Sequence, residues 1–188
     1  MVPGYSGASH YAVFRQILST AKLERLLVLG VYFGRDITFF LDIAMRQARP
    51  LSIAGVDKFS NDACEDWPNE SRNLNWQEAG FGQPPSLDVA LVNVAKFGDV
   101  KLIQANDDIF LARCQDKFDA VYIDTSHDYE TVVRQIKQSA PLLNPGGFLF
   151  GDDYSDDGTW GVKRAVCELV PNHKVFNNWI WFAPQSVV

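Results

Sequence analysis

Short apolar runs alternate with helix-like segments along most of this chain of 188 residues. Continuous apolar runs are typical of strands buried on both faces of a sheet, and they lie at residues 26–31, 52–57, 100–105, 118–124 and 148–151. Apolar residues at helical spacing predict helices at residues 8–23, 34–49, 86–97, 109–114, 128–143 and 159–169. A terminal hairpin is predicted over 174–182, turning at Asn177-Asn178. This alternation predicts an α/β fold, with a mostly parallel sheet and helices on both faces.

The composition fits one globular domain, which we expect to span residues 1–188. Apolar residues make up 47% of the chain and charged residues 21%, as in ordinary globular proteins. The net charge of −6 argues against binding of nucleic acid or of an anionic membrane, because both require a basic surface. The composition is therefore compatible with an enzyme that acts on small molecules.

Cysteine usage and hydropathy bear on where the protein works. Cys64, Cys114 and Cys167 have neither CxxC nor metal-ligand spacing, which predicts free thiols in a reducing compartment. The first residues lack the basic segment and apolar run of a signal peptide. No stretch reaches the roughly 20 apolar residues of a membrane span. We expect a cytoplasmic protein that makes no membrane contact.

Residues 58–85 interrupt the alternation of strands and helices. The segment is rich in Asn, Asp, Gly and Pro, and it contains Trp67 and Trp76. Loops of this length inside compact domains are usually functional or disordered, and the aromatic residues argue against disorder. The segment is either a lid on the substrate side of a site or a packed loop.

Two of the apolar runs end in aspartates. Asp124 ends the run from Phe118, and Asp152 and Asp153 end the run from Phe148. These runs are expected to be parallel neighbours about 4.8 Å apart, so three carboxylates would meet outside their carboxyl ends, where open α/β sheets bind ligands. Such like charges need a cation, a proton or strong hydrogen-bond donors, and oxygen ligands suit Mg²⁺. Alternatively, one of the paired aspartates caps a turn and a single acid faces the cleft.

His127 follows Asp124 by three residues, in a loop that enters a predicted helix. Imidazole groups titrate near neutral pH and are the commonest general bases. In the alternative interpretation, Thr125 and Asp128 form a capping box-like start of the helix and His127 only lines it. The offset from a candidate metal ligand favours the catalytic role.

A glycine-containing turn, Gly30-Val-Tyr-Phe-Gly34, follows the first apolar run and does not match the GxGxxG dinucleotide fingerprint. It either lets a nucleotide-like ligand approach the backbone at a helix N-terminus or is only a tight turn. Asp57 ends the second run, where an acid can accept hydrogen bonds from ribose hydroxyls. Asn106-Asp107 ends the third run, near where an adenine would lie, unless Asp107 caps the next helix.

Taken together, these motifs resemble the class I S-adenosylmethionine-dependent methyltransferases. Within that class they resemble the divalent-metal-dependent O-methyltransferases of the macrocin and catechol type. The resemblance covers about residues 24–183 and rests on VLGVYFGRD, GVDKF, LIQAND, FDAVYIDTSHDYE and LLNPGGFLFGDDY. It implies a Rossmann-like, seven-stranded, mostly parallel sheet whose last strand is antiparallel.

The same resemblance implies roles for individual residues. The residues implied to contact S-adenosylmethionine are Gly30, Gly34, Asp57, Lys58, Asn106, Asp107 and Asp124. The implied Mg²⁺ ligands are Asp124, Asp152 and Asp153, and the implied base is His127. Two positions depart from the family. Val28 stands where an acidic residue is usual, which leaves the contact with the amino group of the cofactor open, and Ala105-Asn106 replaces a common Gly-Asp pair.

The expected activity is transfer of a methyl group from S-adenosylmethionine to a hydroxyl of a small molecule, assisted by Mg²⁺. A sugar, a catechol or a natural-product diol is the expected class of acceptor. A metal-independent methyltransferase, a dinucleotide-dependent oxidoreductase and a non-catalytic protein of the same fold are alternatives. The missing GxGxxG counts against the oxidoreductase, whereas Val28 gives weight to the non-catalytic protein. Aromatic residues in 58–85 and in the N-terminal helix leave a homodimer open.

Overall fold

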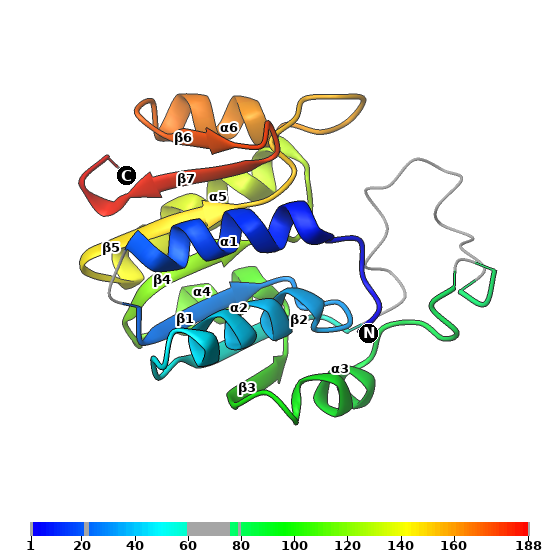
Figure 1. The fold of residues 1–188 in the computed structure, drawn as a ribbon. Helices are drawn as coiled ribbons and strands as arrows, with labels where there is room; N and C mark the ends of the chain where they lie inside the picture. The colour runs from blue at the N-terminus through cyan, green and yellow to red at the C-terminus, as the bar shows by residue number, and fades with distance from the viewer. Residues whose placement is uncertain (1, 21–22, 60–75, 79, 188) are drawn as a thin grey trace.

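A seven-stranded sheet forms the centre of the computed structural model, which describes residues 2–20, 23–59, 76–78 and 80–187 (Figure 1). The strands lie in the order β3-β2-β1-β4-β5-β7-β6. They are β1 (Arg25–Leu29), β2 (Ser52–Asp57), β3 (Asp99–Gln104), β4 (Phe118–Ile123), β5 (Leu143–Gly151), β6 (Lys174–Phe176) and β7 (Ile180–Pro184).

Strand directions confirm the predicted Rossmann-like sheet. The first five strands of the chain pair in parallel, β7 pairs antiparallel with β5, and β6 pairs antiparallel with β7. Only β7 therefore runs against the others. In the register of β4 and β5, Ile123 lies opposite Gly151. The aspartates that follow these two residues consequently start from adjacent positions at one edge of the sheet.

Helices cover both faces of the sheet, as predicted (Figure 1). They are α1 (Ala8–Thr20), α2 (Arg35–Arg46), α3 (Leu87–Val94), α4 (Asp107–Arg113), α5 (Tyr129–Ser139) and α6 (Val162–Leu169), with 3₁₀ turns at Ala140–Leu142 and Gln185–Val187. Helices α1, α2 and α3 share one core with Val28 and Tyr122. Helices α4, α5 and α6 share the other core with Leu27 and Ile123. Neighbouring strand residues thus bury their side chains on opposite faces, as the pleat requires.

Side chains cap three of the helices by accepting a hydrogen bond from the backbone amide three residues later. Ser86 caps α3, and Asn106 and Asp128 cap α4 and α5. The cap of α4 is therefore Asn106 rather than Asp107. Similarly, α5 begins after Asp128, so Thr125 does not start this helix through a capping box. Both caps lie at the carboxyl edge of the sheet, beside the predicted site.

The predicted C-terminal hairpin is confirmed, with β6 and β7 joined through Asn177 and Asn178. Both asparagines have positive φ angles, 55° and 57°. Asparagine tolerates this left-handed backbone conformation better than other residues that carry a Cβ atom. The second strand begins at Ile180, one residue later than the apolar pattern suggests.

Most of the predicted lid segment 58–85, including Trp67, lies outside the described residues. Two aromatic residues near its end are described, and they contact the turn after β1. The ring of Trp76 lies 6.1 Å from that of Tyr32, and the ring of Phe81 lies 5.3 Å from that of Phe33, measured between centroids. The end of the segment therefore packs beside the glycine turn, and its action as a lid stays a prediction.

Two other observations concern the expected cellular setting. Cys114 and Cys167 are free thiols, and Cys64 lies outside the described residues. Within the described part of the chain, no helix has both the length and the apolar character needed to cross a bilayer.

At the opposite edge of the sheet, Asp119 of β4 forms hydrogen bonds with the neighbouring strands β1 and β5. Its carboxylate accepts hydrogen bonds from the backbone amides of Glu24 and Arg25, both at 2.9 Å, and from Asn144 at 2.8 Å. Desolvation alone would raise the pKa of Asp119, but these three donors more than offset it and lower the pKa. The ionised carboxylate is therefore the form that stabilises the fold.

Replacing Asp119 by alanine is expected to lower the free energy of unfolding by about 2 kcal/mol at pH 7. A lowered carboxyl pKa contributes stability that is present above the pKa of the unfolded chain and is lost as the pH falls through the folded-state pKa. The difference from wild type should therefore shrink toward pH 3 in urea titrations. The exposed Asp116 is the control, and its alanine variant should stay within about 0.5 kcal/mol of wild type. An undiminished Asp119 effect at pH 3 would contradict the assignment.

Candidate active site

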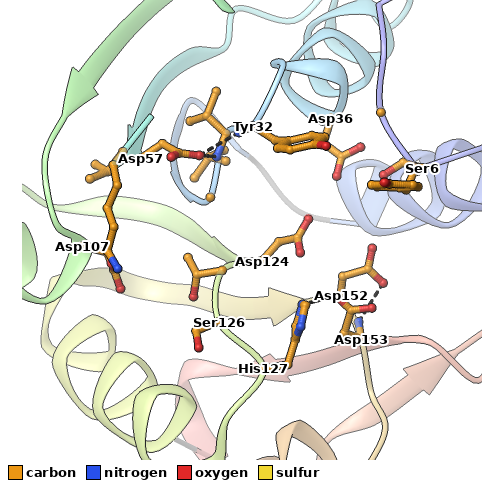
Figure 2. A pocket seen from close by; sticks show the side chains of 18 of the residues that line it. Ser6, Tyr32, Asp36, Asp57, Asp107, Asp124, Ser126, His127, Asp152 and Asp153 are labelled. Atoms are coloured by element: carbon orange, nitrogen blue, oxygen red, sulfur yellow. Dashed lines mark hydrogen bonds and ion pairs between the residues drawn. The ribbon is translucent and has the colours of Figure 1, made fainter. Parts of the chain in front are cut away.

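A cavity of about 730 Å³ lies at the carboxyl edge of the sheet, lined by residues that follow β1, β2, β4 and β5 (Figure 2). Nearly all residues predicted for the site line it. These are Gly30, Asp57, Lys58, Asn106, Asp107, Asp124, His127, Asp152 and Asp153. Gly34 is the exception, since it precedes α2 and a Cβ atom there would lie 2.8 Å from Val94. The sequence motifs thus converge on one cavity, and Gly34 serves helix packing.

The glycine turn brings the end of β1 against the end of β4. Gly30 has a φ of +87°, and a Cβ atom built on it would lie 1.6 Å from the backbone oxygen of Asp124. Any side chain at this position would push the two strands apart. The turn therefore needs glycine both for its backbone conformation and for the close approach that positions Asp124.

Asp57 fixes the same turn through its carboxylate. One oxygen, Oδ2, accepts hydrogen bonds from the amides of Val31 and Tyr32 at 2.8 and 2.7 Å. The other, Oδ1, accepts from the amide of Phe59 at 2.7 Å. A carboxylate has about four lone-pair positions, so capacity for a ligand hydroxyl remains. Beside it, the backbone oxygen of Lys58 accepts from Gln104, and the Lys58 residue is exposed.

A polar network holds Asp107 at the opposite side of the cavity from Asp36 (Figure 2). The side-chain amide of Gln135, which is fully buried, donates to Asp107 and to Thr125. Asn106 is engaged as the cap of α4. Asp107 is thus presented to the cavity by a buried partner, whereas Asn106 has a structural role that is compatible with a contact to a ligand.

The acidic residues form two groups that share Asp124. Within each group the potential ligand atoms all lie within 4.8 Å of one another, and the groups are Asp124–His127–Asp153 and Asp36–Asp124–Asp152. The predicted trio of Asp124, Asp152 and Asp153 is therefore brought together around Asp124, but it is split between the two groups. Burial, followed by the charges of Asp152 and Asp153, raises the pKa of Asp124 well above its ordinary value. Acids this close together need a cation, a proton or hydrogen-bond donors to offset their repulsion.

Tyr122 provides a neutral donor among these charges. Its hydroxyl lies 3.1 Å from Asp36, 3.4 Å from Asp124 and 3.4 Å from Asp152. A phenol carries a single proton, so it satisfies one carboxylate at a time. Burial and then the charges of Asp36 and Asp124 raise the pKa of Tyr122 well above its usual range, which keeps the hydroxyl protonated as a donor.

His127 is buried and is held by contacts on both sides of its ring. Its Nε2 atom lies 2.7 Å from Asp153 Oδ2, and its ring lies 4.5 Å from that of Trp160. The other nitrogen, Nδ1, is buried without a hydrogen-bond partner among the described residues. Asp153 itself has a φ of +57°, a strained conformation for a residue with a side chain, and such strain clusters at functional sites.

Two residues of the cavity, His10 and Asp36, are missed by the sequence reasoning. His10 in α1 lies 3.2 Å from Asp152 through Nε2 and accepts from the amide of Gly7 through Nδ1, so Nε2 carries the proton. Its hydrogen bond to Asp152 raises the pKa of His10. Asp36 stands in the first turn of α2, where an acid usually only complements the helix dipole. The sequence therefore gives no reason to place Asp36 in the site, and no motif around His10 indicates a role for it.

Comparisons with known proteins agree with this geometry. A family model described as a methyltransferase domain matches residues 27–154, more than half of the chain. No curated protein matches the chain. Among solved structures, the O-methyltransferase NovP is 16% identical, with 95% of this chain and 80% of NovP covered and a TM-score of 0.66.

Two further structures show the breadth of the fold. Cofactor-bound Rv0187 from MTB is 16% identical, with 98% of this chain and 83% of that chain covered and a TM-score of 0.61. A ribosomal protein L11 methylase from Lactobacillus delbrueckii subsp. bulgaricus is 17% identical, with 97% and 81% covered and a TM-score of 0.57. At these identities the likeness shows a shared fold and does not select an acceptor. The family match and the topology together establish that this chain belongs to the methyltransferase-domain family and has the Rossmann-like methyltransferase fold.

Proposed function

We propose that this protein transfers a methyl group from S-adenosylmethionine to a hydroxyl of a small molecule, with assistance from Mg²⁺. The observation that carries the proposal is the convergence of Asp124, His127, Asp152 and Asp153 beside the glycine turn. A nucleotide-like cofactor and an acceptor hydroxyl would meet there. The acidic residues at this edge give the cavity a strong preference for cationic ligands, which include a divalent ion and a sulfonium cofactor.

The cavity fits the cofactor in size and in the placement of polar groups. Its volume of about 730 Å³ falls within the range of about 300–1,000 Å³ that is usual for ligand sites. Asp57 and Asp107 line it away from the acidic cluster (Figure 2), as binding of a ribose and an adenine would require. When bound, S-adenosylmethionine supplies an activated methyl group, so the protein mainly has to align the donor with the acceptor.

The donor set also fits a hard divalent ion. Asp124, Asp152 and Asp153 would hold Mg²⁺, since carboxylate oxygens are its preferred protein ligands. When bound, the ion would lower the pKa of an acceptor hydroxyl. Burial and, after it, the charges of Asp152 and Asp153 raise the pKa of Asp124, and such an ion would offset those charges.

His127 is proposed to accept the proton of the acceptor hydroxyl. Nε2 lies 2.7 Å from the Asp153 carboxylate, so in the neutral imidazole it carries the proton and donates to that carboxylate. The lone pair that would take up the proton is therefore on Nδ1, which has no hydrogen-bond partner among the described residues. Asp153 then stabilises the imidazolium that forms, and Trp160 holds the plane of the ring. Hydroxylated acceptors such as sugars, catechols or natural-product diols suit this end of the cavity, because carboxylates accept hydrogen bonds from their hydroxyls.

A metal-independent methyltransferase is the second candidate, and the histidine pairs favour it. His10 and His127 each lie beside a carboxylate, Asp152 and Asp153 respectively. Protonated histidines could neutralise these two acids without a metal ion. The acids would then only position the acceptor.

The two candidates separate in one assay. Transfer of a labelled methyl group from S-adenosylmethionine to a panel of sugars, catechols and polyketide diols is measured with Mg²⁺ and with a chelator. Turnover that requires Mg²⁺ supports the metal-assisted reaction, and undiminished turnover in chelator supports the second candidate. If none of the panel is methylated and S-adenosylmethionine does not bind, the proposed function is wrong.

Binding of Mn²⁺, a spectroscopic probe for the Mg²⁺ site, is expected to weaken as the pH is lowered from neutral. Burial and the neighbouring Asp152 and Asp153 raise the pKa of Asp124, so protons compete with the ion at the lower pH. Each displaced proton contributes up to about ten-fold in affinity per pH unit. Electron paramagnetic resonance of free Mn²⁺ gives the affinity. An affinity that does not fall at any pH at which the protein stays folded would mean that Asp124 is not a ligand.

A further inference from the structure

His10 is a histidine of the cavity that the proposed metal-assisted chemistry leaves without a role. It belongs to α1, which precedes the first strand, and it lines the cavity together with Asp152. Its Nε2 atom lies 3.2 Å from Asp152 Oδ2, and the two side chains are only 17% and 7% exposed. A hydrogen bond so little exposed to water is stronger than the same bond at the surface.

The surroundings of the His10 ring decide which nitrogen donates. Nδ1 accepts a hydrogen bond from the backbone amide of Gly7 at 3.3 Å, so the proton of the neutral ring is on Nε2. The ring also lies 6.2 Å from that of Phe14, edge to face, and Phe14 is fully buried in the core. The fold of α1 thus directs an N–H donor at Asp152, and this donor is present without a charge on the ring.

Asp152 depends on His10 because its other donors are limited. Oδ1 accepts from the backbone amide of Asp153, its neighbour in the site, at 2.9 Å (Figure 2). The Tyr122 hydroxyl lies 3.4 Å from Oδ2, but it lies closer to Asp36, at 3.1 Å. Its single proton serves one carboxylate at a time. Among the described residues, His10 is therefore the side chain that gives Asp152 a donor of its own.

Such a hydrogen bond fixes the direction of a carboxylate that binds a metal ion. Loss of a partner of this kind typically lowers metal affinity about 10- to 100-fold. A carboxylate has about four lone-pair positions, so Asp152 can still bind an ion after His10 and the amide of Asp153 have donated to it.

We propose that His10 is the positioning residue that orients Asp152 toward the metal ion, an inference that rests on the proposed function. His10 is not itself a ligand, because Nε2 carries a proton and Nδ1 is engaged with Gly7. The N-terminal helix α1 is in this way a part of the metal site.

The affinity for Mn²⁺, measured by electron paramagnetic resonance of the free ion, tests this role without any turnover. His10→Ala removes the donor and is expected to weaken binding roughly 10- to 100-fold. His10→Gln keeps an N–H donor at a similar distance from the backbone, and its affinity should return to within about three-fold of wild type. Glutamine does not titrate, so this rescue separates a hydrogen bond from a charge. Circular dichroism confirms that each variant is folded.

Tyr11→Phe is the matched control for the docking of α1. The Tyr11 hydroxyl donates to Asp42 of α2 at 2.6 Å, and neither residue lines the cavity. Its removal should change Mn²⁺ affinity less than about two-fold. Weakening as large as that of His10→Ala would mean that looser packing of α1 explains both losses, and it would overturn the specific role of His10.

A double-mutant cycle tests whether the effect passes through Asp152. Asp152→Asn is expected to weaken Mn²⁺ binding by itself, while Asp124 and Asp153 remain. Adding His10→Ala to Asp152→Asn should cause no more than about a two-fold further loss. A further loss as large as that in the wild-type background would mean that His10 acts on another group.

The outcomes separate this role from the proposed function. If wild type binds Mn²⁺ and His10→Ala binds it equally well or more tightly, the role of His10 is wrong while the metal site stands. Failure of glutamine to restore the affinity that alanine loses would have the same meaning. If wild type does not bind Mn²⁺, the metal-assisted reaction and the role of His10 are both wrong.

Discussion

Replacing Asp124 by asparagine is expected to abolish methyl transfer, with kcat/KM falling on the order of 10²–10³-fold or more, because this residue belongs to both acidic groups of the cavity. The substitution keeps the size of the side chain and removes one of several mutually repelling charges. The fold should therefore persist, with an unfolding temperature at or above that of wild type. Steady-state kinetics with an identified acceptor and Mn²⁺ binding measure the two losses.

The control for Asp124→Asn is Asp116→Asn, since Asp116 is an exposed acid near Arg25, away from the cavity. It should match wild type in both assays. An Asp124→Asn protein that is folded, retains its Mn²⁺ affinity and turns over at more than a tenth of the wild-type rate would refute the central place of this residue.

Replacing Gly30 by alanine is expected to destabilise the fold by about 3 kcal/mol or more, through left-handed backbone strain and overpacking. The added Cβ atom would lie 1.6 Å from the backbone oxygen of Asp124, so β1 and β4 must separate. Asp124 moves with the end of β4, and Mn²⁺ binding should fall together with stability. Urea unfolding and Mn²⁺ titration at a temperature where the variant is folded measure the two effects.

Gly146 offers a matched control for the cost of left-handed backbone strain alone. Its φ is +81°, close to the +87° of Gly30, but a Cβ atom there meets nothing within 4 Å. Gly146→Ala should cost only about 1–2 kcal/mol and leave Mn²⁺ binding unchanged. Equal costs for the two substitutions would show that the contact with Asp124 does not matter.

The sequence could predict the sheet edge because buried parallel strands leave a simple pattern. The run at residues 52–57 coincides with β2 at both ends, and β4 and β5 place Asp124 and Asp152 at adjacent positions, as expected from their register. Helix bounds were less predictable, since capping depends on which of two neighbouring polar side chains reaches the backbone. At α4 that residue is Asn106 and not Asp107.

The remaining parts of the site depend on tertiary contacts that no local pattern records. His10 reaches Asp152 because α1 packs on the face of the sheet that also holds Tyr122. Asp36 looks like an ordinary acid at a helix start until the fold brings it to Asp124. The division of the carboxylates into two groups likewise follows from side-chain directions rather than from their spacing in the chain.

The most direct test of the account is calorimetric titration of the chelator-stripped protein with S-adenosylmethionine, repeated with Mg²⁺. We predict one-to-one binding in both conditions, which would establish the cofactor despite Val28. Absence of binding with and without Mg²⁺, in a protein shown to be folded, would contradict the account and leave a methyltransferase fold without its proposed cofactor.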